Sequence, residues 1–223
     1  MVFDLRDVLR LKYEEIGRWL KNNRLQIGYC PYCGYFNFWK QFVEKAKEVS
    51  KGKLRCPVCS KNKIIRRFSI YSPVHIRGFT RAIEHFIALK TLRRPEDYLK
   101  LVLKIITNAM FFVHVASEYI DDLFIGILLG KRGVPGVWIK SIYLIENPKL
   151  KGIKSFDLGR YFHRSQEIQQ SLIIVDGIVA FKGDADVTFD GLMKEWEIVT
   201  NFNEIVELNK KFFVPLYKTA ENI

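Results

Sequence analysis

The spacing of hydrophobic positions changes along this chain, and the changes predict where helices and strands lie. Helical spacing predicts amphipathic helices at residues 4–24, 38–51, 79–92, 95–107, 120–129 and 203–212. Short apolar runs predict strands at residues 111–116, 137–145, 172–175, 178–181 and 196–199. A strand, a helix and a second strand in that order imply that the two strands pair in parallel. The pattern therefore predicts a mixed α/β fold in the C-terminal half.

Two dipeptides mark sharp changes of direction in this pattern. Asp176-Gly177 separates Leu172–Val175 from Ile178–Phe181. Asp-Gly is favoured in type I′ turns, because both central residues of that turn need a positive φ. We therefore expect a buried β-hairpin here. Ser72-Pro73 is expected to break the chain ahead of the helix at 79–92.

Positive charge is concentrated in the N-terminal half of the chain. The 36 Lys and Arg residues outnumber the 24 Asp and Glu residues, which gives a net charge of +12. Residues 1–72 hold 16 basic against 6 acidic residues, residues 73–108 hold 7 against 3, and residues 109–223 hold 13 against 15, so the excess is +10, +4 and −2. This asymmetry favours a polyanionic partner for the N-terminal half.

The apolar segments are too short for a membrane span. Leu123–Leu129 is the longest candidate, whereas a membrane helix needs roughly twenty apolar residues. The N-terminal segment is charged and lacks the apolar core of a secretion signal. We therefore expect a cytoplasmic protein with no membrane partner.

All four cysteines belong to two C-P-x-C motifs, Cys30 with Cys33 and Cys56 with Cys59. Each motif can present two thiolates to one ion, and the two motifs together fill a tetrahedral site with no open position. The sequence thus predicts a structural Zn²⁺ in a module that resembles a zinc ribbon. The 22-residue spacer contains the helix predicted at 38–51. Two disulfides or unrelated thiols are the alternatives.

Basic and aromatic residues alternate within and just after this module. The candidate phosphate contacts are Lys45, Lys47, Lys51, Lys53, Arg55, Lys61, Lys63, Arg66 and Arg67. The aromatic residues between them are Tyr29, Tyr32, Tyr35, Phe36, Phe38, Trp39 and Phe68. Cations contact phosphates and exposed rings stack on unpaired bases, so the set favours nucleic-acid binding, DNA or RNA. The alternatives are a solvated basic face and rings that cover the zinc core.

The hairpin and the residues after it resemble the signature of the phospholipase D superfamily. That signature is H-x-K-x4-D, followed by G-[GS]-x-N. On this chain its aspartate falls on Asp176, its glycine on Gly183 and its asparagine on Asp186. The resemblance covers about residues 110–217. It implies a half-domain with a mixed β-sheet flanked by helices, as in the nucleases and phosphodiesterases of the superfamily.

The catalytic positions of that signature hold other residues in this chain. Gln169 stands at the position of the nucleophilic histidine, and Ser171 at that of the lysine that neutralises phosphoryl charge. Glutamine is not a useful nucleophile and serine brings no positive charge, so the resemblance implies a degenerate site. Asp176, Asp186 and Glu197, which matches a glutamate of the family, are the candidates for a remnant pocket; the alternative is that they are surface carboxylates and turn aspartates. Such a group of carboxylates repels phosphate unless it holds a divalent cation.

The four histidines add little to this interpretation. His75 and His85 are assigned no role, and His114 is expected in the core. His163 precedes the hairpin and is the candidate for a catalytic histidine that has changed position.

These observations predict four segments and three alternative functions. The segments are a basic amphipathic helix at 1–27, a zinc-ribbon-like module at 28–72, a helical connector at 73–108 and a phospholipase D-like domain at 109–223. The leading function is non-catalytic nucleic-acid binding. An active nuclease with a rearranged site and a non-catalytic subunit of a nuclease or guide-dependent defence complex are the alternatives. A single signature resembles half an enzyme and predicts a homodimer or an accessory heterodimer with a protein subunit.

Overall fold

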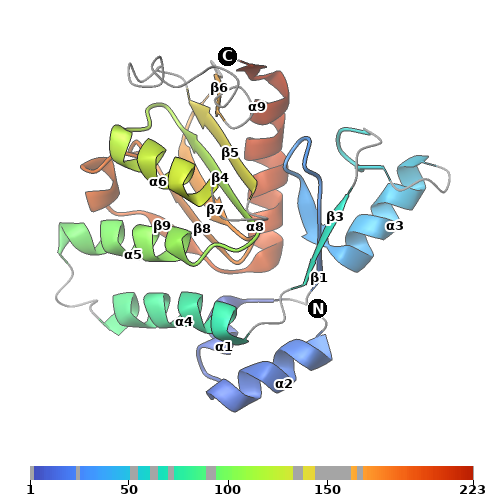
Figure 1. The fold of residues 1–223 in the computed structure, drawn as a ribbon, viewed down its shortest axis with the longest axis horizontal. Coiled ribbons are helices and arrows are strands. Elements are labelled where there is room, and N and C mark those ends of the chain that lie inside the picture. Colours follow the sequence, from blue (N-terminus) through green and yellow to red (C-terminus); the bar gives the residue numbers. More distant parts are fainter. Residues whose placement is uncertain are drawn as a thin grey trace.

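The computed structural model places a large mixed sheet beside a small antiparallel one (Figure 1). It describes residues 3–23, 26–50, 55–60, 65–69, 73–88, 94–132, 138–143, 162–164 and 168–222. The helices are α1 Leu5–Val8, α2 Tyr13–Asn23, α3 Trp39–Ser50, α4 Pro73–Ala88, α5 Pro95–Thr107, α6 Asp122–Arg132, α8 Phe202–Leu208, the π-helical turn η3 Asn209–Phe213, and α9 Val214–Thr219. A 3₁₀ turn, η2, covers Gly191–Met193.

The large sheet has the strand order β10-β6-β5-β4-β7-β8-β9. Its strands are β4 Phe112–Ser117, β5 Trp138–Tyr143, β6 Phe162–Arg164, β7 Ser171–Val175, β8 Val179–Gly183, β9 Glu197–Val199 and β10 Glu221–Asn222. The expected parallel pairing of the first two strands is confirmed, and β6 continues it. β7, β8 and β9 add antiparallel neighbours on the other side of β4. The predicted fold class, an α/β domain with a mixed sheet flanked by helices, is confirmed.

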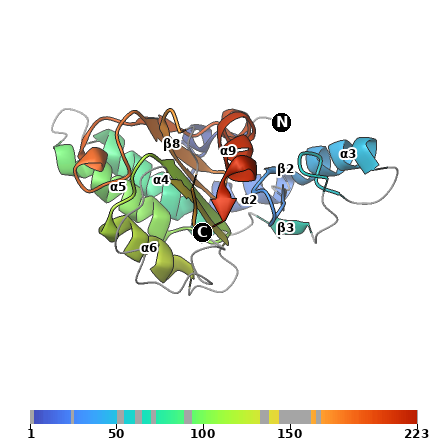
Figure 2. The ribbon, with the colours of Figure 1, turned by 90° about the horizontal axis from the view of Figure 1, so that it is seen from above.

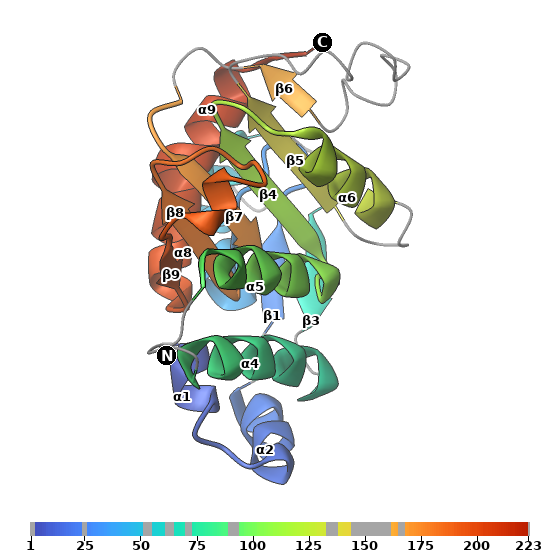
Figure 3. The ribbon, with the colours of Figure 1, turned by 90° about the vertical axis from the view of Figure 1, so that its left-hand side faces the viewer.

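The helices form a layer on each face of this sheet. Figure 3 shows α5 and α6 on one face, and α8 with α9 on the other. His114 points to the second face, because its ring stacks on Phe213 of η3 at a centroid distance of 4.4 Å. Apolar strand residues such as Val115, Ile173 and Phe181 are fully buried between the layers.

The predicted hairpin forms between β7 and β8, with Val175 opposite Val179. Its central residues have positive φ angles, 54° for Asp176 and 69° for Gly177, and the Ile178 amide donates to the Val175 carbonyl at 3.0 Å. This is the type I′ geometry that Asp-Gly favours. A Cβ on Gly177 would lie 2.8 Å from the Phe36 ring, so glycine is needed for space as well as for φ.

The small sheet contains β1 Gln26–Tyr29 between β2 Phe36–Phe38 and β3 Arg66–Ser69, with α3 packed against it. A Cβ on Gly28 would lie 2.7 Å from Phe42, which shows how closely α3 approaches β1. Figure 2 shows α9 next to this module. Tyr29 stacks on Phe112 of β4 at 4.8 Å and Phe38 on Phe202 of α8 at 3.9 Å. The small and large sheets therefore share a core.

Two helix predictions need correction. The single helix expected at residues 4–24 is divided into α1 and α2. Asp4 caps α1 and also accepts a hydrogen bond from the Thr200 hydroxyl at 2.8 Å, so a tertiary contact places the start of α1. The helix expected from Phe79 begins at Pro73 instead, because proline is tolerated in the first turn, where its missing N–H is not needed. Within the described residues, no helix is long and apolar enough to cross a membrane.

Candidate zinc centre and nucleic-acid interface

The four cysteines converge on one point. Their Sγ atoms all lie within 4.8 Å of one another, with Cys30 3.7 Å from Cys59 and Cys33 3.6 Å from Cys56. Four sulfurs bound tetrahedrally at about 2.3 Å from Zn²⁺ are about 3.8 Å apart, whereas a disulfide needs about 2.05 Å. The spacing matches a Cys₄ metal site and excludes disulfides in this conformation.

Two similar turns build this site. In each, an amide after the second cysteine donates to the carbonyl of the first, Gly34 to Cys30 and Ser60 to Cys56, both at 2.9 Å. Gly34 and Ser60 have positive φ angles of 76° and 55°. The Val58 amide also approaches the Cys56 sulfur at 3.5 Å. Such an N–H donor stabilises a thiolate, so the backbone supplies part of what a metal-bound sulfur requires.

Hydrogen bonds among the thiols lower the pKa of one cysteine and raise the pKa of two others. Hydrogen bonding with Cys30 raises the pKa of Cys33 far above its usual range and raises that of Cys56 as well. Hydrogen bonds from Cys33, and next from Cys56, lower the pKa of Cys30. A divalent cation would let all four sulfurs ligate as thiolates, because its charge offsets their mutual repulsion. The donor set therefore fits Zn²⁺.

The basic side chains around the module are only partly described. Arg66 and Arg67 on β3 and Lys45 on α3 are exposed, and Arg55 is half-buried with no hydrogen-bond partner for its Nε among the described residues. The Arg67 guanidinium lies over the Trp39 ring at 5.1 Å and contacts Gln26. Lys51, Lys53, Lys61 and Lys63 lie outside the described residues, and the structure places only the backbone of Lys47.

The rings of the module mostly belong to the core. Tyr29, Tyr35 and Phe36 are at most 1 % exposed, and Phe68 stacks on Phe111 at 4.8 Å. Tyr32, at 38 % exposure, is the large side chain of this group that faces solvent. The rings thus stabilise the junction between the two sheets. Most of them are core residues, as the alternative interpretation of the sequence expected.

The Asp176 carboxylate forms hydrogen bonds with three backbone amides and with a histidine. Its carboxylate accepts from the backbone amides of Met110, Phe111 and Phe112 at 2.7–2.8 Å and lies 2.9 Å from His75 Nε2. Asp176 is fully buried and His75 is 6 % exposed. The carboxylate thus joins the hairpin to the start of β4 and to α4. No role was predicted for His75, because 101 residues separate it from its partner and no motif links them.

The other residues of the expected remnant pocket lie away from Asp176. Ser171 is at the opposite end of β7, and five residues of strand span about 16 Å. Its hydroxyl is 3.0 Å from Ser117 Oγ, which is 3.2 Å from Asp186 Oδ1. Glu197 instead pairs with Lys182 at 2.9 Å. The three carboxylates do not converge, and the four cysteines are the one group with metal-ligand spacing among the described residues.

His114 connects the zinc module to the large sheet. It is fully buried, as expected, with Nε2 3.1 Å from the Tyr29 hydroxyl and Nδ1 3.0 Å from Asn209 Oδ1. Asn209 Nδ2 in turn donates to the carbonyl of Gly34 at 3.2 Å. A buried polar chain therefore runs from the zinc turn to η3 and β4. His85 is exposed on α4, and the structure places only the backbone of His163, on β6.

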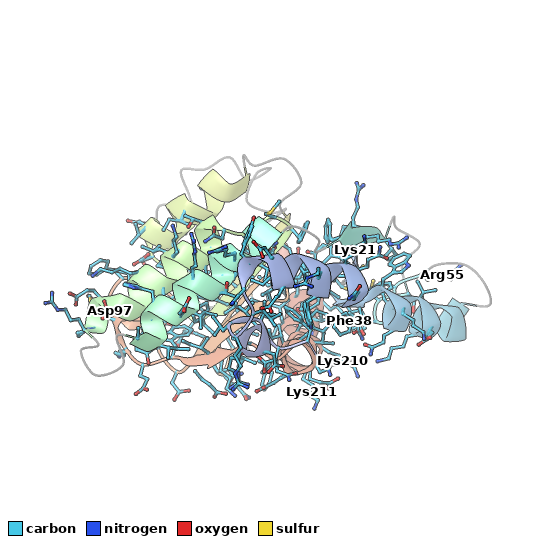
Figure 4. The ribbon with its side chains drawn as sticks, turned by 90° about the horizontal axis from the view of Figure 1, so that it is seen from below. Lys21, Phe38, Arg55, Asp97, Lys210 and Lys211 are labelled. Atoms are coloured by element: carbon cyan, nitrogen blue, oxygen red, sulfur yellow. The ribbon has the colours of Figure 1, made fainter. Side chains whose placement is uncertain are left out.

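A cleft of about 600 Å³ opens where β7 begins. It is lined by Ala116 and Leu172 of the sheet and by Gln169, Gln170, Lys211 and Phe212. Gln169 is exposed, and Gln170 Nε2 has no hydrogen-bond partner among the described residues. In the view of Figure 4, Lys21, Lys210 and Lys211 lie between Arg55 at the zinc module and Asp97 at the far end of the molecule. The sequence did not predict this cleft, because η3 completes it from a distant part of the chain.

Comparison with known proteins gives matches in structure but not in sequence. No protein-family model matches the chain, and no curated protein matches its sequence. NucT from Helicobacter pylori matches with 17 % identity and a TM-score of 0.43, over 58 % of this chain and 92 % of that one. TrmBL2, an archaeal chromatin protein whose structure is described as showing a novel mode of DNA binding, matches with 16 % identity and a TM-score of 0.44, over 67 % of this chain and 64 % of its own.

Proposed function

We propose that this chain binds nucleic acid through the basic surface around its zinc module, on a phospholipase D-like domain that lacks the catalyst. The observation that carries the proposal is the segregation of charge. Residues 1–72 have an excess of +10, and the described basic side chains Arg66, Arg67 and Lys45 face solvent. Cations fixed on a small rigid module can contact several phosphates at once, and each contact releases counterions.

The residues at the signature positions support binding without cleavage. Gln169 is exposed and has no titratable nitrogen, and Ser171 is buried against Ser117. Lys182, the lysine on β8, forms an ion pair with Glu197. His75 and His114 have buried structural partners. The large domain thus supplies a scaffold, while the zinc module supplies charge.

A salt titration tests this function. Anisotropy of labelled single-stranded and double-stranded DNA and RNA should show affinity that falls steeply as salt rises. The double variant Arg66→Ala/Arg67→Ala should bind more weakly and reduce the slope of log K against log salt by about 2, since each lost phosphate contact contributes roughly 0.9. Lys100→Ala/Lys104→Ala on α5 makes the same change of charge away from the zinc module and should leave the slope unchanged.

The same samples distinguish the two alternatives. Intact substrates after binding support the non-catalytic function. Cleavage that disappears in a His163→Ala variant would establish a nuclease with a rearranged site. An absence of binding at low salt, together with co-purification of a protein partner, would instead indicate a subunit of a larger complex.

The metal has a structural role in this proposal. We expect one Zn²⁺ per chain by elemental analysis. Because Tyr35, Phe42 and Val214 pack around the cysteines, chelation should loosen the module and its contact with α9. The free energy of unfolding should fall by about 3 kcal/mol or more, measured in urea with and without chelator. An equal stability of both forms would contradict a structural zinc.

The single signature leads us to propose pairing with a second copy or with another subunit. Light scattering with and without nucleic acid tests the homodimer. A stable monomer under both conditions would contradict it.

A further inference from the structure

We propose that the cleft at the start of β7 holds one unpaired nucleotide of a bound strand. This inference rests on the proposed function, because the zinc module would hold the strand whose base enters the cleft. Gln170, together with Gln169 at the histidine position of the signature, would then recognise a base.

The size and position of the cleft suit a small planar group. Its volume of about 600 Å³ is within the range of about 300–1,000 Å³ that is typical of ligand sites. Ala116 and Leu172 of the sheet and Pro215 and Leu216 of α9 give it an apolar lining. β7 is paired on both sides, with β4 and with β8, so an extended peptide cannot add a strand here.

Adjacent amides supply the polar groups of the cleft. A glutamine amide both donates and accepts, as the edge of a base requires, and Gln or Asn can bind adenine with two hydrogen bonds. Gln170 Nε2 is shielded from solvent and has no partner among the described residues. An unsatisfied buried donor costs free energy, and a turn of the Gln170 amide toward the cleft would let an acceptor on a ligand recover it. Gln169, which is exposed, can reach the same edge.

The π-helical turn η3 places an aromatic ring, Phe212, and a positive charge, Lys211, beside the cleft. Asn209 and Phe213 point inward to His114, and the three residues between them, Lys210, Lys211 and Phe212, are exposed. π turns occur often at functional sites. Phe212 is 38 % exposed and can stack on a base, and Lys211 can contact its phosphate. Among the described residues, Lys211 has one ion pair, an exposed contact with Glu207 at 3.4 Å, and none of the described lining residues is acidic.

The test compares single strands with blunt duplexes, using labelled oligonucleotides of adenine or thymine. Phe212→Ala should weaken single-strand binding about tenfold, the effect of one lost stacking contact, and leave duplex binding unchanged. Gln170→Leu, which keeps the shape but removes the amide, should abolish the difference between the two bases. Phe189→Ala is the matched control for Phe212→Ala, because Phe189 is exposed and lies outside the cleft.

Photo-crosslinking with a 5-iodouracil oligonucleotide gives a second measurement on the unaltered chain. The cleft predicts crosslinks to the peptide that contains Phe212, whereas crosslinks confined to residues 26–69 would overturn the inference. Wild-type affinity for single strands in both cleft variants, with binding still weakened by Arg66→Ala/Arg67→Ala, would remove the cleft and keep the proposed function. An absence of binding by the wild-type chain at low salt would overturn both.

Discussion

The two ends of β7 differ in how completely their polar groups are satisfied. At the hairpin end, the Asp176 carboxylate is fully buried, accepts hydrogen bonds from three backbone amides and contacts His75. At the other end, Gln169 is exposed, Gln170 Nε2 has no partner among the described residues, and a cleft of about 600 Å³ begins. The polar groups at the hairpin end are satisfied within the protein, whereas the other end borders a cleft.

This difference separates the two parts of the segment whose sequence resembles the phospholipase D signature. The aspartate position organises the backbone around it, since its bonds join the hairpin, the start of β4 and α4. Gln169, at the other end, is exposed, so its side chain contributes little to holding the fold. The residue at this position can therefore differ without disturbing the fold, provided that the hairpin end stays intact.

Asp176→Asn should be the most damaging test of the hairpin end. An amide places a donor opposite the backbone N–H groups that now donate to a carboxylate, which leaves buried groups unsatisfied. We expect the free energy of unfolding to fall by about 3–5 kcal/mol, as when one partner of a buried ionic cluster is lost. Urea unfolding measures this loss. Asp184→Asn, on an exposed residue that follows β8, should change stability by less than about 0.5 kcal/mol.

Gly177→Ala tests the turn beside Asp176. Its φ of 69° and the Phe36 ring 2.8 Å from a new Cβ both oppose alanine. We expect a loss of about 2 kcal/mol by urea unfolding. Gly126→Ala is the matched control, because a Cβ at Gly126 meets nothing within 4 Å on α6. Gly126→Ala should stabilise the protein by roughly 0.5–1 kcal/mol. If both variants lost stability, the loss at Gly177 could not be assigned to the turn.

Local patterns predicted much of this fold. The Asp-Gly turn, the parallel pairing of β4 with β5, and helix α5 beginning at Pro95 all follow from residues that are close in sequence. The convergence of the four cysteines follows from a motif with a known coordination chemistry. In each case the sequence contains the whole physical reason.

Contacts between distant segments were not predictable in this way. The bond from His75 to Asp176 and the start of α1 at Asp4 both depend on partners about a hundred residues away or more. The rings Tyr29 and Phe36 are buried because the small sheet packs on Phe112, which composition alone does not reveal. The open cleft likewise needs η3 beside β7.

Ser171→Ala, at the start of β7, should have the smallest effect on the free energy of unfolding. The Ser171 hydroxyl is 3.0 Å from Ser117 Oγ, and Ser117 Oγ also contacts the Tyr119 carbonyl, Asp186 Oδ1 and the Val187 amide. Removing the Ser171 hydroxyl therefore leaves no group without a partner, and urea unfolding should show a loss of only about 1 kcal/mol. Ser117→Ala removes the shared atom and should cost about 2–3 kcal/mol, because the buried Val187 amide loses its acceptor. If Ser171→Ala were the costlier of the two, this end of β7 would be as closed as the hairpin end, and the comparison would fail.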